Sequence, residues 1–148
     1  MAPDAEKVLI YARRDCRVLV FDEPDFPEVP LQVPGGTLEH GEVPLEAAKR
    51  EFHEETGLFL HEGWSGLGSI DYHFRKNGAR LCHRRHIFTV PTPEGVPENW
   101  LHTEKHSSDG GGPIRFRLFF LDWKEAAASI GLGMELPLSW PTLRIFFA

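Results

Sequence analysis

Apolar residues near the N-terminus follow the pattern of two β-strands joined by a short turn. The runs KVLIYARRD (residues 7–15) and RVLVFDE (residues 17–23) are rich in β-branched and apolar side chains, and Asp15 and Cys16 separate the two strands. This pattern predicts a hairpin. The stretch EPDFPEVP (residues 23–30) is rich in proline and acid and predicts a loop. LQVPGG (residues 31–36) then predicts a short strand that ends in a turn.

A second pair of strand-like runs flanks the sequence RKNG (residues 75–78). These runs are GWSGLGSIDYHF (residues 63–74) and ARLCHRRHIFTV (residues 79–90). The Asn-Gly step between them is a strong signal for a tight turn. We therefore expect a second, longer hairpin.

The C-terminal third predicts one more strand and one more helix. PTPEGVPENW (residues 91–100) and HSSDGGGP (residues 106–113) read as loops, the second of them mobile. IRFRLFFLD (residues 114–122) alternates as an apolar strand. WKEAAASI (residues 123–130) begins a helix that the two following glycines are expected to end, while residues 134–148 show no clear pattern.

A helix is predicted over Pro44–Thr56, with signals at both of its ends. Proline suits the first turn of a helix, because its missing N–H would have no partner there. Gly57 is well placed to end the helix in a left-handed conformation. Leu45, Ala48 and Phe52 follow helical spacing and predict one apolar stripe. Hairpins interleaved with two helices indicate an α/β fold in which helices cover a mixed sheet.

Length, composition and charge narrow the class of protein. The chain has 148 residues, of which 41% are hydrophobic and 26% charged, and we expect a single domain over residues 1–148. No apolar run approaches the ~18 residues that span a bilayer. The N-terminus has no basic segment followed by a long apolar region, so we expect no secretory signal there. A net charge of −6 argues against general nucleic-acid binding, which needs a basic surface. Cys16 and Cys82 predict reduced thiols in a cytoplasmic protein.

The predicted helix carries more negative charge on one face than its stability favours. Glu51, Glu54 and Glu55 stand at i, i+3 and i+4 and project together. The last two also lie near the helix C-terminus, where the helix dipole disfavours negative charge. An ion pair between Glu46 and Arg50 would recover part of this cost. A divalent cation would resolve the conflict, and oxygen ligands in this number suit Mg²⁺ or Mn²⁺; the alternative is an ordinary solvated acidic helix.

The spacing of these residues resembles the signature box of the Nudix hydrolases. The box spans Gly36 to Leu58, and its fixed positions here are Gly36, Glu42, Arg50, Glu51, Glu54, Glu55, Gly57 and Leu58. Phe52 is bulkier than the aliphatic residue usual at its position. The resemblance implies an α/β/α sandwich with a mixed β-sheet between helices. It also implies metal-dependent hydrolysis of a nucleoside diphosphate linked to another moiety, X.

The resemblance also implies roles for the box residues. The metal ligands would be Glu51, Glu54 and Glu55, with Glu42 and the carbonyl of Gly36 as further candidates. The general base lies among the three helical glutamates, and which of them serves is left open. Arg50 would orient the carboxylates by hydrogen bonding and relieve their repulsion. Members of the family often add a carboxylate from a loop before the last strand, which here could be Glu98, Glu104 or Asp109.

The longer hairpin is basic in an otherwise acidic chain. Its cationic residues are Arg75, Lys76, Arg80, Arg84 and Arg85. They predict either a phosphate-binding surface or ordinary hairpin solubility. Arg84 and Arg85 are adjacent in a strand, so their side chains point to opposite faces, and only one of them can bind substrate opposite the carboxylates.

Two other classes of function remain open at this level. A non-catalytic Nudix fold that senses a nucleotide would be expected to lack box carboxylates, which are all present here. A zinc-stabilised interaction protein could draw ligands from Cys82, His83, His86, His102 and His106. The four tryptophans could stack on a base or anchor the core. The moiety X (a sugar, ribose, a second nucleoside, an oxidised base on a triphosphate or a capped RNA end) and a homodimeric state are left open.

Overall fold

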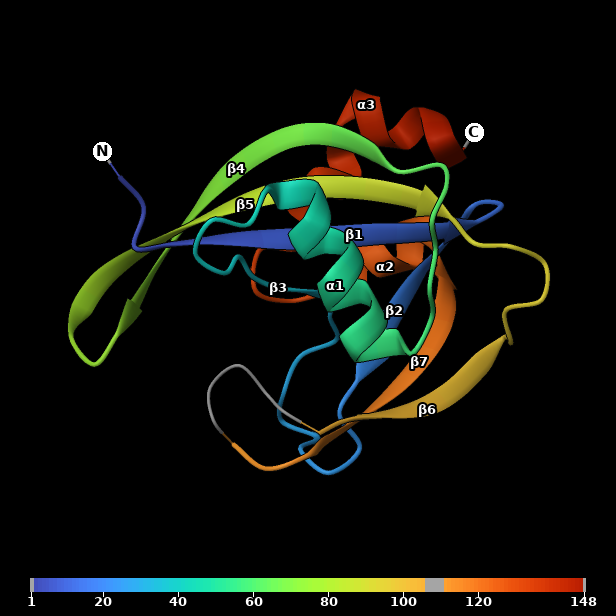
Figure 1. Cartoon of the computed structure of the whole chain (residues 1–148), viewed down its shortest axis with the longest axis horizontal. Helices are drawn as coiled ribbons and strands as arrows, with labels where there is room; N and C mark the ends of the chain where they lie inside the picture. Colours follow the sequence, from blue (N-terminus) through green and yellow to red (C-terminus); the bar gives the residue numbers. More distant parts are fainter. Residues whose placement is uncertain (1, 106–110, 148) are drawn as a thin grey trace.

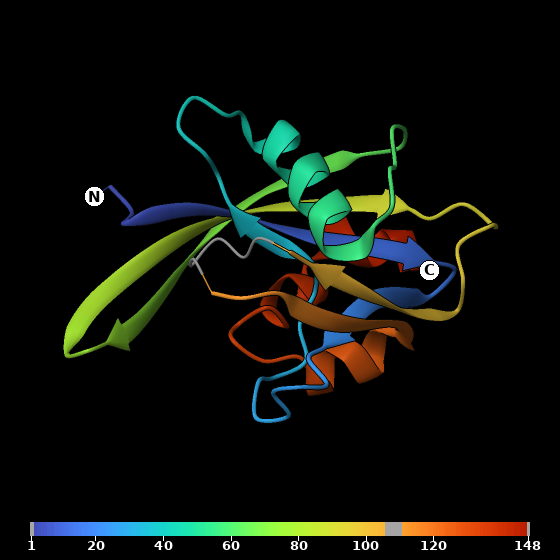
Figure 2. The same cartoon turned by 60° about the horizontal axis from the view of Figure 1, so that its bottom comes forward.

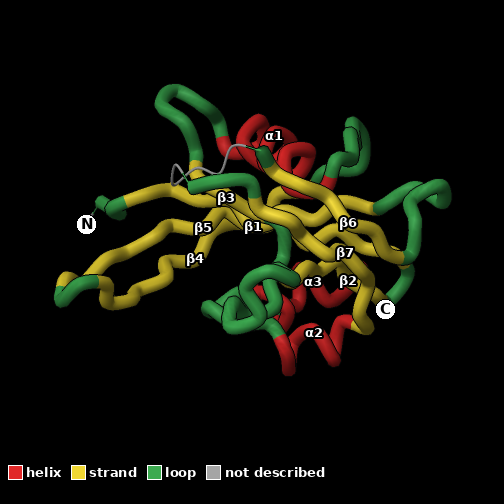
Figure 3. The backbone as a smooth tube through the Cα atoms, turned by 90° about the horizontal axis from the view of Figure 1, so that it is seen from below, coloured by secondary structure: helices red, strands yellow, loops and turns green. Residues whose placement is uncertain are grey.

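A computed structural model describes residues 2–105 and 111–147. The chain folds into three layers, a central sheet with helices on both faces. The sheet is built from β1 (Ala5–Arg14), β2 (Arg17–Asp22), β3 (Gly35–Thr37), β4 (Ser65–Lys76), β5 (Ala79–Pro91), β6 (Asn99–Glu104) and β7 (Ile114–Asp122). The helices are α1 (Pro44–Thr56), α2 (Trp123–Ser129) and α3 (Pro141–Arg144), with the short 3₁₀ turns η1 (Leu136–Ser139) and η2 (Ile145–Phe147). Helix α1 covers one face of the sheet, while α2 and α3 cover the other (Figures 1 and 3). The α/β/α sandwich with a mixed sheet is therefore confirmed.

The sheet forks at β1. Its strand order is β4-β5-β1-β2-β7-β6, and β3 also pairs with β1. Strand β1 runs parallel to β5 and antiparallel to its other partners. It pairs with β2 only near Arg13 and Arg14, whereas residues Lys7 to Leu9 pair with β3. Because β2 and β3 diverge from the same edge of β1, the sheet opens between them.

Both predicted hairpins are confirmed. In the first, Asp15 turns the chain between β1 and β2 with a φ of 54°. In the second, Asn77 and Gly78 have φ values of 51° and 80°, as a two-residue turn between twisted strands requires. The turn end of this β4–β5 hairpin projects beyond the rest of the sheet (Figures 1 and 2). The hairpin is called the arm below.

Strand β6 lies where the sequence was interpreted as loop. The residues of β6 that are turned inward are Trp100, His102 and Glu104, while Leu101 is 60% exposed. Polar side chains therefore take two of the three inward positions, which removes the apolar alternation that marks a strand. The prediction of a loop was wrong here, and Glu104 ends a strand. The loop predicted over residues 106–113 lies mostly outside the described residues.

Two smaller predictions also need correction. In the run LQVPGG, Leu31 and Gln32 form only isolated bridges, and the strand proper is Gly35–Thr37. Helix α2 is confirmed, but it ends at Ser129, with Ile130 as its C-cap, before the glycines that follow. Ile130 is extended because it bridges to Leu31, so a tertiary contact ends the helix before a glycine can.

The two faces of the sheet carry separate apolar cores. Side chains alternate along β1, so Val8 and Ile10 pack toward α1, whereas Leu9 and Tyr11 pack toward α2 and the C-terminal turns. Phe52 is fully buried under α1, which stabilises the fold by roughly 1.5–3 kcal/mol. Its extra bulk meets the edge of the Trp64 ring, with the ring centroids 5.8 Å apart.

The structure also shows where the predicted apolar stripe, the tryptophans and the cysteines lie. Leu45, predicted in the apolar stripe of α1, is 38% exposed, because the stripe turns away from the sheet at the first helical turn. The four tryptophans pack against the two cores: Trp64 and Trp100 on the α1 side, Trp123 and Trp140 on the other. Both cysteines are free thiols, as predicted. No helix among the described residues is long and apolar enough to cross a membrane.

Candidate active site

Helix α1, which carries most of the acidic side chains, begins and ends where the sequence predicts. Its N-cap residue Val43 makes no side-chain capping bond, and Pro44 takes the first turn. Gly57 follows the helix with a φ of 80°, and its N–H donates to the carbonyl of His53, which is the left-handed ending that glycine favours. Burial of Phe52 fixes the rotation of the helix and turns its acidic face toward β3.

Glu51 is almost fully buried against the backbone of Gly36. A side chain at position 36 would place its Cβ 2.1 Å from Cδ of Glu51, well inside the closest approach of two carbon atoms. Only glycine fits there. The close approach brings the carbonyl-bearing backbone of β3 and the carboxylate of α1 to the same point.

Glu55 is tied to the neighbouring glycine. Its Oε1 accepts a hydrogen bond from the backbone N–H of Gly35 at 2.7 Å. A Cβ at Gly35 would lie 2.3 Å from the carbonyl oxygen of Val8, so glycine also lets β3 lie tightly against β1. The two glycines of the box therefore serve separate carboxylates of the helix.

Arg50 holds three of the box carboxylates in place. Its Nε and Nη2 donate to both oxygens of Glu42 at 2.8 and 2.9 Å, which forms a bidentate pair. Its Nη1 donates to Glu51 at 2.9 Å and to both oxygens of Glu54 at 3.3 Å. The ion pair predicted with Glu46 is not formed, because the guanidinium reaches the box carboxylates instead.

Burial sets the charge state of these carboxylates. It raises the pKa of Glu51 to about 7, with the charges of Glu54 and Glu104 adding to the rise and Arg50 opposing it. Burial also raises the pKa of Glu55 well above its usual value. The Arg50 guanidinium lowers the pKa of Glu42. Burial therefore disfavours the charged forms of Glu51 and Glu55, and a bound cation would stabilise those charged forms.

Strand β6 brings one further carboxylate to the helix. Glu104 is 9% exposed. The strand is anchored beside α1 by Trp100, whose Nε1 donates to the Thr56 carbonyl at 2.8 Å, and by His102, whose Nε2 lies 3.0 Å from the Glu54 carbonyl oxygen. These contacts fix the end of the strand next to the acidic face of α1.

Three carboxylates meet closely enough to hold a metal ion. Oxygen atoms of Glu51, Glu54 and Glu104 lie within 4.8 Å of one another, and they face a hollow also lined by Thr37, Leu38, Glu39 and Arg50, called the acidic hollow below. A set of hard oxygen donors fits Mg²⁺ or Mn²⁺. Gly36 touches this group through Glu51, whereas Glu42 is engaged by Arg50.

The remaining carboxylate and zinc candidates lie elsewhere. Glu98 is bonded to Arg17 at 2.8 Å and also pairs with Arg14, so it is not part of the acidic hollow. Asp109 and His106 lie outside the described residues. Over the described part of the chain, Glu51, Glu54 and Glu104 make up the one group with metal-ligand geometry. It includes no cysteine or histidine, and the zinc interpretation gains no support there.

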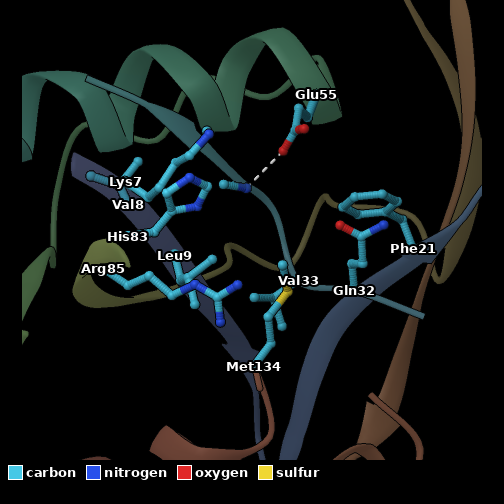
Figure 4. Close-up of a pocket in the computed structure, with 12 residues that line it drawn as sticks. Lys7, Val8, Leu9, Phe21, Gln32, Val33, Glu55, His83, Arg85 and Met134 are labelled. Atoms are coloured by element: carbon cyan, nitrogen blue, oxygen red, sulfur yellow. Dashed lines mark hydrogen bonds between the residues drawn. The ribbon is translucent and has the colours of Figure 1, made fainter. Parts of the chain in front are cut away.

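A cavity of about 190 Å³ opens where β2 and β3 diverge from β1 (Figure 4). It is called the cationic cavity below, and its lining comes from the strands, α1 and the C-terminal tail: Lys7, Val8, Leu9, Phe21, Gln32, Val33, Gly35, Gly36, Glu55, His83, Arg85 and Met134. Lys7, His83 and Arg85 gather on one side, and Phe21 and Gln32 lie on the other (Figure 4). The cavity adjoins the acidic hollow at Gly36, which lines the cavity and contacts Glu51.

The cationic side of this cavity lacks matching acids. Arg85 is 6% exposed, yet no ion pair within the described residues joins its guanidinium to a carboxylate. Its Nη1 donates to the Leu132 carbonyl, and its Cζ lies 3.9 Å from the centroid of the Tyr72 ring. Burial lowers the pKa of Lys7, and the nearby charge of Arg85 lowers it further, although Glu51 raises it. This side is therefore suited to an anion.

The two adjacent arginines of the arm have different surroundings. Arg84 is partly exposed and forms a bidentate pair with Asp71, at 2.9 and 3.2 Å. Arg85 lies on the opposite face and lines the cationic cavity. Of the two, only Arg85 is placed next to the box residues.

Sequence reasoning missed several residues of the cavity. Lys7, Gln32 and Met134 were not singled out, and His83 was named among the zinc candidates. These residues come from distant parts of the chain, and no spacing rule connects them. Only the register of the parallel β1–β5 pair, which sets Lys7 beside Arg85, brings the cations together.

Solved structures with this fold include two MutT proteins and an Ap4A hydrolase. The MutT protein from Bacillus halodurans superimposes with a TM-score of 0.66 at 20% identity, covering 97% of this chain and 83% of that one. The Ap4A hydrolase from C. elegans gives a TM-score of 0.56 at 16% identity, covering 97% and 98%. A MutT structure from a study of the Aliivibrio salmonicida and Vibrio cholerae proteins gives a TM-score of 0.57 at 18% identity, covering 97% of this chain and 96% of that one. At these identities the likeness establishes the fold.

The sequence itself matches one family. No curated protein sequence matches the chain. The family model described as the NUDIX domain, however, matches residues 3–111, which include β1 to β6, the acidic hollow and all of the cavity lining except Met134. The chain therefore belongs to the NUDIX domain family, and it is a pyrophosphohydrolase of the Nudix type.

Proposed function

We propose that the protein hydrolyses the diphosphate linkage of a nucleoside diphosphate joined to a second moiety, and that it requires Mg²⁺ or Mn²⁺. One observation carries the proposal. The acidic hollow and the cationic cavity adjoin at Gly36, so sites suited to a cation and to phosphate lie next to each other. In a metal-bound diphosphate, the metal ion would lie in the acidic hollow and the negatively charged phosphates in the cationic cavity.

The carboxylates divide into two groups in this proposal. Glu51, Glu54 and Glu104 would hold the cation, helped by the carbonyl of Gly36. A bound divalent cation supplies charge neutralisation on phosphate oxygens and acidifies water. Glu55 stands on the cavity side, bonded to the Gly35 N–H. One of the three helical glutamates accepts the proton of the attacking water as it adds to phosphorus and the P–O–P bond breaks, leaving two phosphate monoesters.

Arg50 acts through the carboxylates in this account. Its bonds to Glu42, Glu51 and Glu54 fix their orientation and offset their mutual repulsion. Glu42 is thereby assigned to positioning Arg50, because both of its oxygens are taken by the guanidinium. Arg50 itself needs no contact with substrate.

The cationic cavity would bind the phosphates and what they carry. Lys7 and Arg85 both line the cavity, and they would donate charge-assisted hydrogen bonds to phosphate oxygens. Phe21, Gln32 and Met134 line the rest of the cavity with apolar surface and one amide, a combination that suits a small organic group. The substrate is accordingly a nucleotide-sized molecule. The two free thiols support a cytoplasmic location in this proposal.

A substrate panel tests the proposal. Nucleoside triphosphates, ADP-ribose, nucleotide sugars and dinucleoside polyphosphates are incubated with the protein and Mg²⁺ or Mn²⁺, and phosphate is measured with and without added phosphomonoesterase. We expect phosphate only with the phosphomonoesterase for the compounds with two esterified ends, because the products are monoesters. Glu54→Gln serves as the inactive control. Binding without turnover across the panel would instead indicate a sensor.

A further inference from the structure

Arg85 is a buried cation held by few contacts. Its side chain lines the cationic cavity (Figure 4) and the residue is 6% exposed. Among the described residues, the guanidinium donates one hydrogen bond, from Nη1 to the carbonyl oxygen of Leu132 at 2.6 Å. No acceptor in the described part of the chain engages Nε or Nη2, so these N–H groups are available to a ligand.

The ring of Tyr72 supports the guanidinium from strand β4. Tyr72 pairs with His83, which lies two residues before Arg85 on the same face of β5, so Tyr72 and Arg85 are diagonal neighbours. The Arg85 Cζ lies 3.9 Å from the centroid of the ring, a cation–π contact. Phe74 stacks with Tyr72, with ring centroids 5.6 Å apart. The ring is thus itself held, and it restricts the rotation of the guanidinium above it.

A turn at residues 132–134 supplies the acceptor for Nη1. Leu132 and Gly133 have φ values of 61° and 77°, so the chain is left-handed at two successive residues. The turn is tied to the sheet at Met134, whose carbonyl oxygen accepts a hydrogen bond from the buried Tyr11 hydroxyl at 2.6 Å. The Leu132 carbonyl is therefore fixed where the guanidinium meets it.

Gly133 lets the turn, the ring and the guanidinium lie together. A Cβ at this position would stand 2.7 Å from Cε1 of Tyr72 and 3.3 Å from Nη1 of Arg85. The turn lies outside residues 3–111, which match the NUDIX family model, so membership of the family assigns it no role.

We propose that Tyr72 and the turn at residues 132–134 position Arg85, so that its remaining N–H groups face the substrate phosphates. The inference rests on the proposed function, in which Arg85 binds phosphate. Neither Tyr72 nor the turn needs to touch substrate. An arginine that is oriented before the substrate arrives loses less side-chain freedom on binding, so its contact contributes more to affinity. If these contacts only stabilise the fold, substrate affinity is independent of them.

Substitutions at Tyr72 test the ring. Tyr72→Leu should raise KM about fivefold with kcat nearly unchanged, whereas Tyr72→Phe, which keeps the ring, should retain the wild-type KM. In an Arg85→Ala background, Tyr72→Leu should raise KM no further, because Tyr72 acts through Arg85. Thermal melts of all variants accompany the kinetics. Independent, additive effects of Tyr72→Leu and Arg85→Ala would overturn the inference, as would a Tyr72→Phe variant as impaired as Tyr72→Leu.

Gly133→Ala tests the turn, and Gly78→Ala is its matched control. The two glycines have φ values of 77° and 80°, so both substitutions add similar backbone strain. A Cβ at Gly78, however, would meet nothing within 4 Å. Gly133→Ala should raise KM by a factor similar to that of Tyr72→Leu, while Gly78→Ala should not. Equal losses of melting temperature with KM unchanged in both variants would show that the turn is only structural.

Calorimetric binding of ADP, with Ca²⁺ in place of Mg²⁺, separates this inference from the proposed function. The same pattern of affinity losses in a protein that cleaves no compound of the panel would support the positioning role and contradict the proposed function. Turnover by the wild type with unaltered ADP affinity in Tyr72→Leu would leave the proposed function intact and overturn the positioning role. Absence of ADP binding by the wild type would overturn it too, because Arg85 would then bind no phosphate.

Discussion

Gly36 and Glu51 constrain each other, because the carboxylate fills the space that a side chain at position 36 would need. We predict that Gly36→Ala displaces Glu51 and lowers kcat about 100-fold, the effect of moving a catalytic group by about 1 Å. The control is Gly95→Ala, where a new Cβ would meet nothing within 4 Å. Steady-state kinetics and thermal melts of both variants check this. Normal kinetics for Gly36→Ala would show that the Glu51 position is unimportant.

The other helical glutamates permit a conservative test. Glu54→Gln and Glu55→Gln should each lower kcat by at least ~100-fold without lowering the melting temperature of the metal-free protein. Burial disfavours the charged form of Glu55, and a glutamine oxygen can still accept the Gly35 N–H. The measurement is a melt with and without Mg²⁺ beside a rate assay. Loss of activity explained by unfolding alone would count against the assigned roles.

The adjacent arginines of the arm should respond unequally. Arg85→Ala removes a charge-assisted contact to phosphate, worth roughly 1.5–3 kcal/mol, and should raise KM about tenfold or more while kcat changes little. Arg84→Ala removes only the surface pair with Asp71 and should change neither. Arg85→Lys, which keeps the charge, should recover part of the affinity. If Arg85→Ala leaves KM unaltered, the phosphate site lies elsewhere.

At the scale of elements, β6 adds a carboxylate that the box does not contain. We predict that Glu104→Gln lowers the turnover rate at limiting Mg²⁺ by about tenfold, because one of several metal ligands is lost. At high Mg²⁺ the rate of the variant should recover. Glu98→Gln, an acid already paired with Arg14 and Arg17, is the matched control. Rates measured across a Mg²⁺ series distinguish the two variants. Identical Mg²⁺ curves for wild type and Glu104→Gln would remove Glu104 from the metal site.

The sequence predicted the elements whose signals are local. Helix α1 carries a proline at its start, a glycine at its end and apolar residues between them, so its bounds followed from three short-range rules. Its three clustered carboxylates lie within about one helical turn, so predicting the helix also predicted that they lie on one face. Strand β6 was missed because its inward positions include His102 and Glu104, whose placement depends on contacts with α1 that no local pattern encodes.

At the scale of the whole molecule, the cavity exists because the sheet forks. Strand β1 pairs with β3 over one part of its length and with β2 over another. The C-terminal segment lines the opening between them with Met134. The Tyr11 hydroxyl donates a hydrogen bond to the carbonyl oxygen of Met134 at 2.6 Å. Residues such as Lys7 and Arg85 meet only through this topology. This explains why the sequence could predict the carboxylate group of α1 but not the cavity beside it.

The dependence of turnover on a divalent cation tests the central claim most directly. The cleavage rate of the best substrate of the panel is measured in excess chelator and then across a Mg²⁺ titration, for the wild type and for Glu54→Gln. Ca²⁺ is the control cation, because it is larger and takes a looser geometry. We predict no turnover in chelator, saturable recovery with Mg²⁺ or Mn²⁺, little with Ca²⁺, and a low plateau for Glu54→Gln. Full turnover in excess chelator would contradict the account.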